Sequence, residues 1–199
     1  MRQDDLTRRI SALKREIDCE VRDRLPRKVA IVAKNHFTQN FRDGGFTNGG
    51  LHPWQRTRRQ QQGGPDSQYG PLTSRRNHLM RSIQTTTAPG RVTVENPVPY
   101  AAIHNDGGDV TTHPTVTARM RRFAWHMVYS LSGRSKGEPQ GELPPEAQKW
   151  KALALTKKTR LTINAHIPQR QFIGDSRELI EKISSIFAET MERIKKLIT

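Results

Sequence analysis

Histidine is the residue type of this chain best suited to metal binding or acid–base chemistry. A zinc site needs several ligands on one face, at short spacings such as HExxH. The chain has seven histidines, and they are scattered: His36, His52, His78, His104, His113, His126 and His166. The single cysteine, Cys19, can neither form a disulfide nor complete a cysteine-based zinc site within one chain. We therefore expect no metal and no cofactor.

Patterns for other reactions are also missing from the sequence. Neither Gly44-Gly45 nor Gly49-Gly50 is followed by the Lys-Ser/Thr pair or the strand and helix context of a phosphate-binding loop, and there is no GxSxG elbow. His104, Asp106 and Asp109 contain the groups of an acid–base cluster, but they lie in a glycine-rich turn without an evident nucleophile. The expected function is not enzymatic.

A basic tract near the first third of the chain is the best candidate for a contact surface. Arg56, Arg58 and Arg59 lie between Trp54 and Tyr69, and this mixture of charge and aromatic rings is found in loops that grip nucleic acid. A solvated loop that is ordered by a neighbouring protein has the same composition. Both interpretations stay open at this stage.

The overall charge widens the choice of partners. The chain has 34 Lys and Arg against 19 Asp and Glu, a formal net charge of +15, which favours nucleic acid, an anionic membrane or an acidic protein surface. Arg119, Arg121 and Arg122 fall on a predicted helix and could form a phosphate-contacting face, although amphipathic helices often carry such residues. Charge alone does not select the partner.

The apolar content is low for a folded domain. Hydrophobic residues make up 33% of the 199 residues and the mean hydropathy is −0.78, so part of the chain is expected to be loop or to be buried only against partners. No stretch approaches the ~20 apolar residues of a membrane helix, and the N-terminus lacks the apolar stretch of a secretory signal. We expect a soluble protein without a membrane contact.

Helical periodicity is clearest at the two ends of the chain. Apolar spacing predicts a long helix kinked at Pro26, or two helices in succession, over residues 4–42, and a terminal helix over 176–198 whose apolar stripe is assigned to the core. Between them, residues 44–71 are glycine-rich and aperiodic, which predicts a long loop.

The middle of the chain mixes short strands and helices. Two β-rich runs around Pro89-Gly90 predict a hairpin, and residues 118–131 and 146–155 predict helices joined by a linker over 132–145. The remaining expected elements are a helical patch over 72–81, a helical turn over 100–105, an extended run over 110–117 and a strand over 161–163. The predicted class is α+β: a small antiparallel or mixed sheet flanked by the long terminal helices, in a single domain spanning residues 1–199 with an inserted segment at about 118–158.

Three short stretches, in order, resemble the virion-morphogenesis (tail-completion) family of Mu-like and P2-like phages, which is related to head–tail neck proteins. The first covers residues 72–83, and the second covers 99–108 and is similar to the family's Tyr-Ala-x-x-His-x-x-Gly segment. The third covers 167–174 and resembles a Pro-x-Arg-Pro-Phe-Leu-Gly element, with Gln171 in place of the second proline. The positions carried over as an assembly or fold motif are Tyr100, Ala101, His104, Gly107, Gly108, Pro168, Arg170, Phe172 and Gly174.

The resemblance implies a structural virion protein made in the host cytoplasm and placed at the head–tail interface. It implies self-assembly as a ring, with a hexamer fitting a tail axis, and contacts with other neck, connector or tail-tube proteins. The net charge of +15 would then line a channel for passing genomic DNA or meet an acidic tail or connector surface. On this interpretation residues 44–71 and 132–145 contact neighbouring subunits or other neck proteins. The alternative is a basic nucleic-acid-binding module that uses Trp54 and the arginines of residues 56–59.

Overall fold

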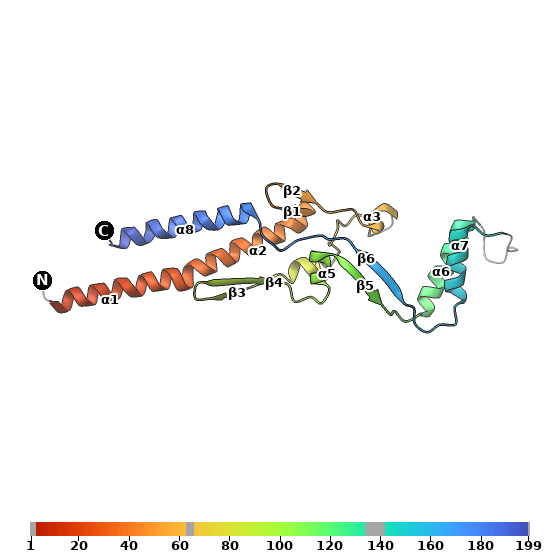
Figure 1. Ribbon diagram of the computed structural model, residues 1–199, viewed down its shortest axis with the longest axis horizontal. Helices are drawn as coiled ribbons and strands as arrows, with labels where there is room; N and C mark the ends of the chain where they lie inside the picture. The colour runs from red at the N-terminus through yellow and green to blue at the C-terminus, as the bar shows by residue number, and fades with distance from the viewer. Residues whose placement is uncertain (1–2, 63–65, 134–141, 199) are drawn as a thin grey trace. The chain divides into compact units, whose positions relative to one another are not determined.

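The structure is a computed structural model that describes residues 3–62, 66–133 and 142–198. The chain divides into two compact units, of which the first comprises Met1–Gly108 and Ile167–Thr199 and the second comprises Asp109–His166. The insertion expected at about 118–158 lies inside the second unit. The α+β class with a long helix at each end is confirmed (Figure 1).

The N-terminal helix is a succession of three segments: α1 (Gln3–Cys19), the π-helix η1 (Glu20–Arg24) and α2 (Leu25–Asp43). Pro26 stands in the first turn of α2 and has no backbone N–H, and the Leu25 N–H bonds to the Glu20 carbonyl, five residues back. The predicted interruption therefore takes the form of a π turn that ends at Pro26. Gly44, in the left-handed conformation at φ +67°, ends the helix.

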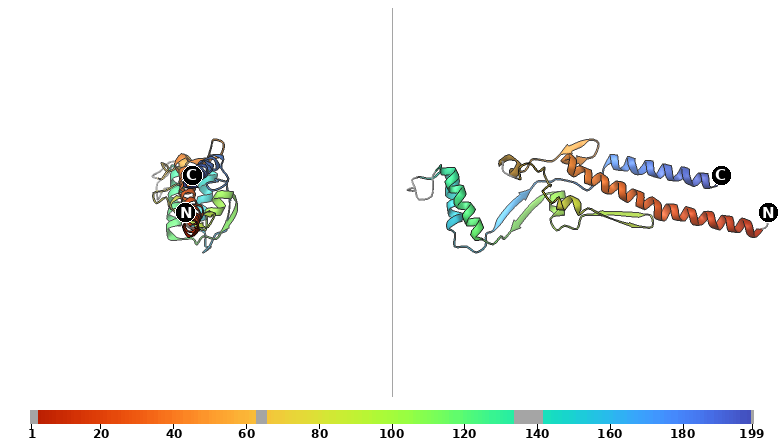
Figure 2. Two further views of the ribbon diagram at one scale, coloured as in Figure 1. Left: turned by 90° about the vertical axis from the view of Figure 1, so that its left-hand side faces the viewer. Right: turned by 180° about the vertical axis from the view of Figure 1, so that it is seen from behind.

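The C-terminal helix α8 (Arg177–Ile198) lies beside α2 and runs in the opposite direction (Figures 1 and 2). Its first turn is capped by Ser176, whose Oγ accepts the Leu179 N–H at 3.3 Å. Leu179 and Ile194 are buried, whereas Ile180 and Phe187 are exposed. The prediction that the whole apolar stripe belongs to the core was therefore wrong, because part of the stripe faces solvent.

In the part of the chain that the structure describes, the expected sheet takes the form of three separate two-stranded sheets. They pair β1 (Gly45–Thr47) with β2 (Leu51–Pro53), β3 (Gln84–Ala88) with β4 (Arg91–Glu95), and β5 (Gly108–Thr112) with β6 (Ile163–Ile167). The β3–β4 hairpin turns at Pro89-Gly90 as predicted. The three remaining short helices are α3 (Arg58–Gln62), α4 (His78–Arg81) and α5 (Ala101–Asp106).

The prediction of a long loop over 44–71 was wrong in its first part. Residues 45–53 form the β1–β2 hairpin, in which Gly49 and Gly50 adopt positive φ and Asn48 donates its N–H to the Gly50 carbonyl at 2.9 Å. Phe46 on β1 is buried. The glycines therefore make a tight turn that returns the chain to the core.

The core of the first unit forms where α2, the β1–β2 hairpin and α8 meet. Its buried side chains are Ala33, Phe37, Phe41, Phe46, Trp54, Leu79, Ile83, Val98, Ala101, Phe172 and Leu179. Burial of these large apolar groups supplies the main stabilisation of the unit.

The second unit is a ribbon, β5 and β6, that continues into a hairpin of two helices. Helix α6 (Ala118–Ser132) begins at Thr117, whose Oγ accepts the Met120 N–H at 3.2 Å, and α7 (Pro145–Leu155) packs against it. Its small core consists of Val128, Leu143 and Ala147, with Trp125 and Trp150 against it. The strand expected at 161–163 corresponds to β6, which begins at Ile163 and ends at Ile167.

A buried carboxylate ties α8 to the N-terminal helix. The Glu20 side chain is 1% exposed and lies 3.0 Å from Arg24, 3.5 Å from Lys28 and 3.2 Å from Arg193 of α8. Burial by itself raises the pKa of Glu20, but the hydrogen bond from Arg24 and the charges of Arg193 and Lys28 outweigh it, so that this pKa lies below its ordinary value of 4.5. Glu20 is therefore ionised at neutral pH.

Replacing Glu20 with Gln should lower the free energy of unfolding by about 1–3 kcal/mol at about pH 7, because three cations lose a buried partner while remaining partly solvated. Glu16→Gln is the matched control, because Glu16 also bonds Arg24, at 2.6 Å, but is 45% exposed. Chemical denaturation measures both variants, and the control should lose no more than about 1 kcal/mol.

The same pair of variants tests the pKa of Glu20. A lowered folded-state pKa gives stability that is complete above the unfolded value of 4.5 and is lost as the pH falls through the folded value. The gap between wild type and Glu20→Gln should therefore close as the pH is lowered below that value. A gap that is unchanged in acid, or an equal loss in Glu16→Gln, contradicts this role.

Candidate functional site

The second and third motif segments, far apart in the sequence, lie side by side in the first unit. The Arg170 N–H donates to the His104 carbonyl at 2.8 Å. The Asn105 side-chain oxygen accepts both the Phe172 N–H at 2.9 Å and the Ile173 N–H at 3.0 Å. A single asparagine thus fixes the backbone of the third segment against α5.

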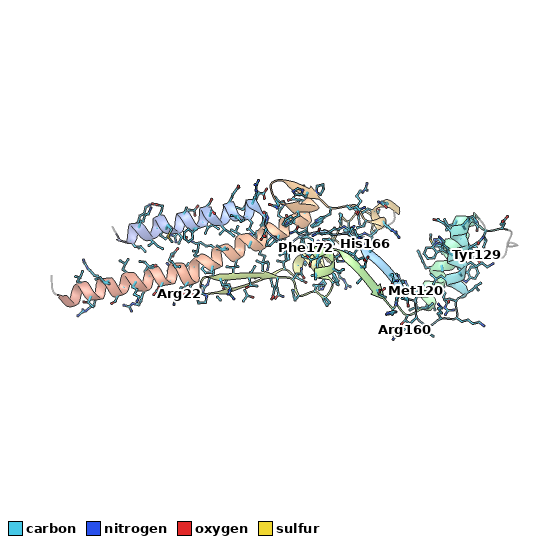
Figure 3. All side chains as sticks on the ribbon, in the orientation of Figure 1. Arg22, Met120, Tyr129, Arg160, His166 and Phe172 are labelled. Carbon is cyan, nitrogen blue, oxygen red and sulfur yellow. The ribbon has the colours of Figure 1, made fainter. Side chains whose placement is uncertain are left out.

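Phe172 is held from its other side by the N-terminal helix. Its carbonyl accepts the Asn40 Nδ2 at 3.2 Å, and its ring, which is almost completely buried, packs against Phe41 with centroids 5.1 Å apart (Figure 3). Asn40 also accepts the Thr47 N–H of β1 at 3.2 Å. The third segment therefore joins α5, α2 and the β1–β2 hairpin.

Sequence reasoning missed Asn40, Asn105 and Glu20 as organising residues. Asn105 lies inside the second motif, between the residues that were selected, and Asn40 and Glu20 are polar residues within the N-terminal helix. The available signal for Glu20 was its position three residues after Ile17, where the next turn of the apolar face would fall.

Trp54 belongs to this cluster and is not part of an exposed contact surface. Its side chain is 8% exposed, its ring meets Phe41 edge-on with centroids 5.5 Å apart, and its indole N–H donates to the Gln171 carbonyl at 2.8 Å. The expectation that Trp54 contacts DNA or a partner is corrected, because the ring is already packed and its donor is satisfied.

The basic tract is divided by the structure. The Arg59 Nη2 donates to the carbonyls of Tyr69, Gly70 and Thr73 at 3.0–3.2 Å, so this arginine folds the following loop onto itself. Arg56 and Arg58 are exposed. Two of the selected arginines thus remain available to a partner, and the third has an internal role.

His104 and Arg170 are neighbouring polar residues of the second and third segments: Arg170 is buried and His104 is half-buried. The Arg170 Nε and Nη2 both donate to the Gln55 carbonyl at 3.2 Å, and burial lowers the pKa of this guanidinium. Burial, and then the charge of Arg170, lower the pKa of His104, so the imidazole is neutral at pH 7. The neutral ring allows the buried arginine to remain nearby without repulsion.

The imagined acid–base cluster of His104, Asp106 and Asp109 is not assembled. Asp106 accepts the Asn105 side-chain amide at 2.8 Å, and Asp109, in the second unit, lies 2.8 Å from the His166 Nδ1. Within residues 3–62, 66–133 and 142–198, no group of three or more His, Cys, Asp or Glu is arranged to hold a metal ion. Among the same residues, no helix has the length and apolar character to cross a membrane.

The remaining motif residues are packing and turn positions. Gly107 has φ +74°, and a Cβ added there would lie 2.8 Å from the Gln169 backbone nitrogen; Gly108 has φ +133°. Ala101 is buried, and Pro168 is half-buried. At Gly174 an added Cβ would collide with the end of the Gln171 side chain, which is able to move.

Tyr100, the first residue of the assembly or fold motif, lies at the surface of the first unit. Its ring is exposed and meets His104 edge-on, with centroids 5.9 Å apart. The ring therefore contacts the half-buried histidine and is also accessible to a partner.

Gly107→Ala should lower the free energy of unfolding by about 2–4 kcal/mol, because the side chain adds a backbone collision to the cost of a positive φ. Gly90→Ala is the control, since Gly90 has φ +67° and open space around its Cβ position. It should lose only about 1 kcal/mol. Thermal or denaturant unfolding compares the two, and equal losses would show that the close approach of the two motif segments does not matter for stability.

The sequence is similar to a known protein family over most of its length. It matches the phage virion morphogenesis family over residues 2–192, which includes all three motif segments. No curated protein and no solved structure matches the chain. The chain belongs to the phage virion morphogenesis family.

Proposed function

We propose that this chain is a structural, non-enzymatic subunit of the head–tail junction that completes the tail or joins it to the head. In this role several copies, six on a tail axis, form a ring that contacts other neck, connector or tail-tube proteins. The family membership supports a structural role in the particle. The observation that carries the ring proposal is an apolar helix face that one chain leaves uncovered.

This face lies on α8. Ile180 is 59% exposed and Phe187 is 51% exposed, and at seven residues apart they lie on the same side of the helix. Leu6, Ile10 and Ile31 of the N-terminal helix are exposed as well. Large apolar side chains at this density on long helices are typical of surfaces that become buried on assembly.

A second copy of the chain is the proposed occupant of this face. The chain has a large excess of positive charge, so copies associate only if apolar burial outweighs the repulsion between them. A ring satisfies this condition because each subunit buries its apolar face against a neighbour while the basic residues stay outside the contact.

Only part of the loops expected to contact neighbouring subunits remains as a proposed contact surface. Residues 45–54 are folded into the hairpin and the core, which leaves the exposed Arg56 and Arg58 as contact candidates in that region. Of the expected linker over 132–145, residues 134–141 lie outside the described part of the chain.

The double variant Ile180→Glu/Phe187→Glu should dissociate the ring, because two carboxylates would be buried in an apolar contact. Its matched control is Ser185→Glu/Ala188→Glu, which places the same charges at exposed positions of α8 away from this face. Light scattering at about 10 µM measures the mass, and we expect at least about 10-fold weaker association for the first variant only. Equal dissociation of both variants would show that added charge, and not the apolar face, is responsible.

The head–tail role is tested in particles. Disrupting the gene should give separate heads and tails, or tails of abnormal length, in electron micrographs of lysates, and supplying the intact gene should restore joined particles. The Ser185→Glu/Ala188→Glu variant should restore them too, and Ile180→Glu/Phe187→Glu should not. Joined particles of normal appearance after disruption would contradict the role.

A further inference from the structure

The strongest unexplained charge lies in the second unit, where the helical hairpin meets the ribbon. Two chain segments are paired there: the Val116 N–H donates to the Thr159 carbonyl at 2.8 Å, and the Leu161 N–H donates to the Pro114 carbonyl at 3.0 Å. This pairing brings the start of α6 next to the chain that leaves α7. Six basic residues flank the junction and are called the basic collar: Arg119, Arg121, Arg122, Lys157, Lys158 and Arg160. Figure 3 labels Arg160 and Met120 in this region.

The collar contains no opposite charge. Residues 110–133 and 147–166 include no Asp or Glu. Every collar residue is exposed except Arg121, which is half-buried. Among the described residues, the ion pairs involve Arg24, Lys28, His166, Arg193 and Lys195, and none involves a collar residue. The collar is therefore a positively charged surface, and none of its side chains forms an ion pair with another described residue.

Folding of the second unit does not account for this arrangement. Three arginines occupy the first turns of α6, where the positive end of the helix dipole repels them and acidic residues would be favourable. Lys157 and Lys158, just after α7, do have the favourable sign for a helix C-terminus. The arginines of α6 are thus unfavourable for the isolated helix, and a bound anion would reverse the sign of that interaction.

We propose that the basic collar contacts the phosphate backbone of double-stranded DNA. Duplex DNA carries a phosphate charge about every 1.7 Å along its axis, and an array of arginines and lysines matches it without reading sequence. Arginine also pairs with phosphate through two parallel hydrogen bonds. The nucleic-acid contact is thus placed in the second unit, whereas the sequence suggested the tract at Arg56–Arg59.

The neighbouring aromatic rings favour a duplex over a single strand. Binding of single strands relies on rings that stack on unpaired bases. Here Phe123, which is 53% exposed, meets Trp150 of α7 edge-on at 5.7 Å, and Trp125 stacks on Tyr129 of the same helix at 5.9 Å, so each of these rings already has an aromatic partner within the hairpin. An acidic protein partner is less favoured, because the centres of protein interfaces are depleted of charge, whereas the collar is charged throughout.

The test uses the full chain and a fluorescent duplex of about 24 base pairs of mixed sequence, with affinity measured between about 50 and about 200 mM KCl. The variant Arg119→Gln/Arg122→Gln/Lys158→Gln/Arg160→Gln removes four exposed collar charges. The control Arg75→Gln/Arg76→Gln/Arg81→Gln/Arg91→Gln removes four exposed charges from the first unit and lowers the net charge equally. Circular dichroism establishes that both variants are folded.

We expect the collar variant to bind duplex at least about 30-fold more weakly at about 100 mM KCl, with a plot of log affinity against log salt about 3–4 units shallower in slope. The control should change affinity by less than about 3-fold. Equal weakening of both variants, no duplex binding by the wild type at about 50 mM KCl, or tighter collar-dependent binding of a single strand of equal length overturns the proposal. Collar-dependent binding of poly-glutamate as tight as that of the duplex would assign the surface to an acidic protein instead.

This inference does not rest on the proposed place in the particle. If disrupting the gene left joined particles intact while the collar still bound duplex, the head–tail role would fail and the DNA contact would stand. The reverse result, separated heads and tails with no duplex binding, would remove only the collar proposal.

Discussion

The peptide groups around Phe172 are fixed from both sides by asparagine side chains. Asn105 accepts the N–H groups of Phe172 and Ile173, and Asn40 donates to the Phe172 carbonyl, while the ring fills the core against Phe41. The chain returns through this segment from the second unit before it forms α8. Because buried backbone groups need partners, these bonds determine where the third segment lies and hence where α8 begins.

The rest of the first unit follows from that anchored segment. The Trp54 indole bonds the neighbouring Gln171 carbonyl, and Ser176 caps α8, which then packs along α2 and meets Glu20 through Arg193. The buried apolar residues of the first unit gather in one cluster, which explains how a chain with only 33% hydrophobic residues forms a core there. The long helices also have exposed apolar side chains, such as Ile10, Ile180 and Phe187, that the described part of the chain does not cover. A structural subunit that is completed by its neighbours fits this distribution.

Local sequence patterns predicted the elements that are determined by residues close together in the sequence. The two terminal helices follow from apolar spacing, the β3–β4 hairpin from Pro89-Gly90, and the end of α6 from Gly133. The β1–β2 hairpin was missed because its strands are only three residues long and are joined by a glycine-rich turn, while the residue that packs it into the core, Phe46, stands alone in the sequence. Trp54 was misassigned for a similar reason: its neighbours in sequence are basic, but the partner that decides its position is Gln171, 117 residues away.

The candidate site shows the same limit. The resemblance selected the two segments that the structure brings together, including His104, Arg170 and Phe172, but it did not indicate that Asn105 makes the connection between them. The collar was only partly visible, because Arg119, Arg121 and Arg122 could be read on one helix, whereas their proximity to Lys157, Lys158 and Arg160 depends on the pairing of Val116 with Thr159. Contacts between distant segments depend on the three-dimensional fold, which local periodicity does not predict.

The most direct measurement is a cryo-electron microscopy reconstruction of the head–tail region of intact particles. We predict a ring at the junction into which the first unit fits, with α8 of each copy facing a neighbouring copy and its Ile180 and Phe187 covered. Particles whose junction contains no density for this chain, or in which it is present as isolated copies with the α8 face open to solvent, would contradict the proposed function.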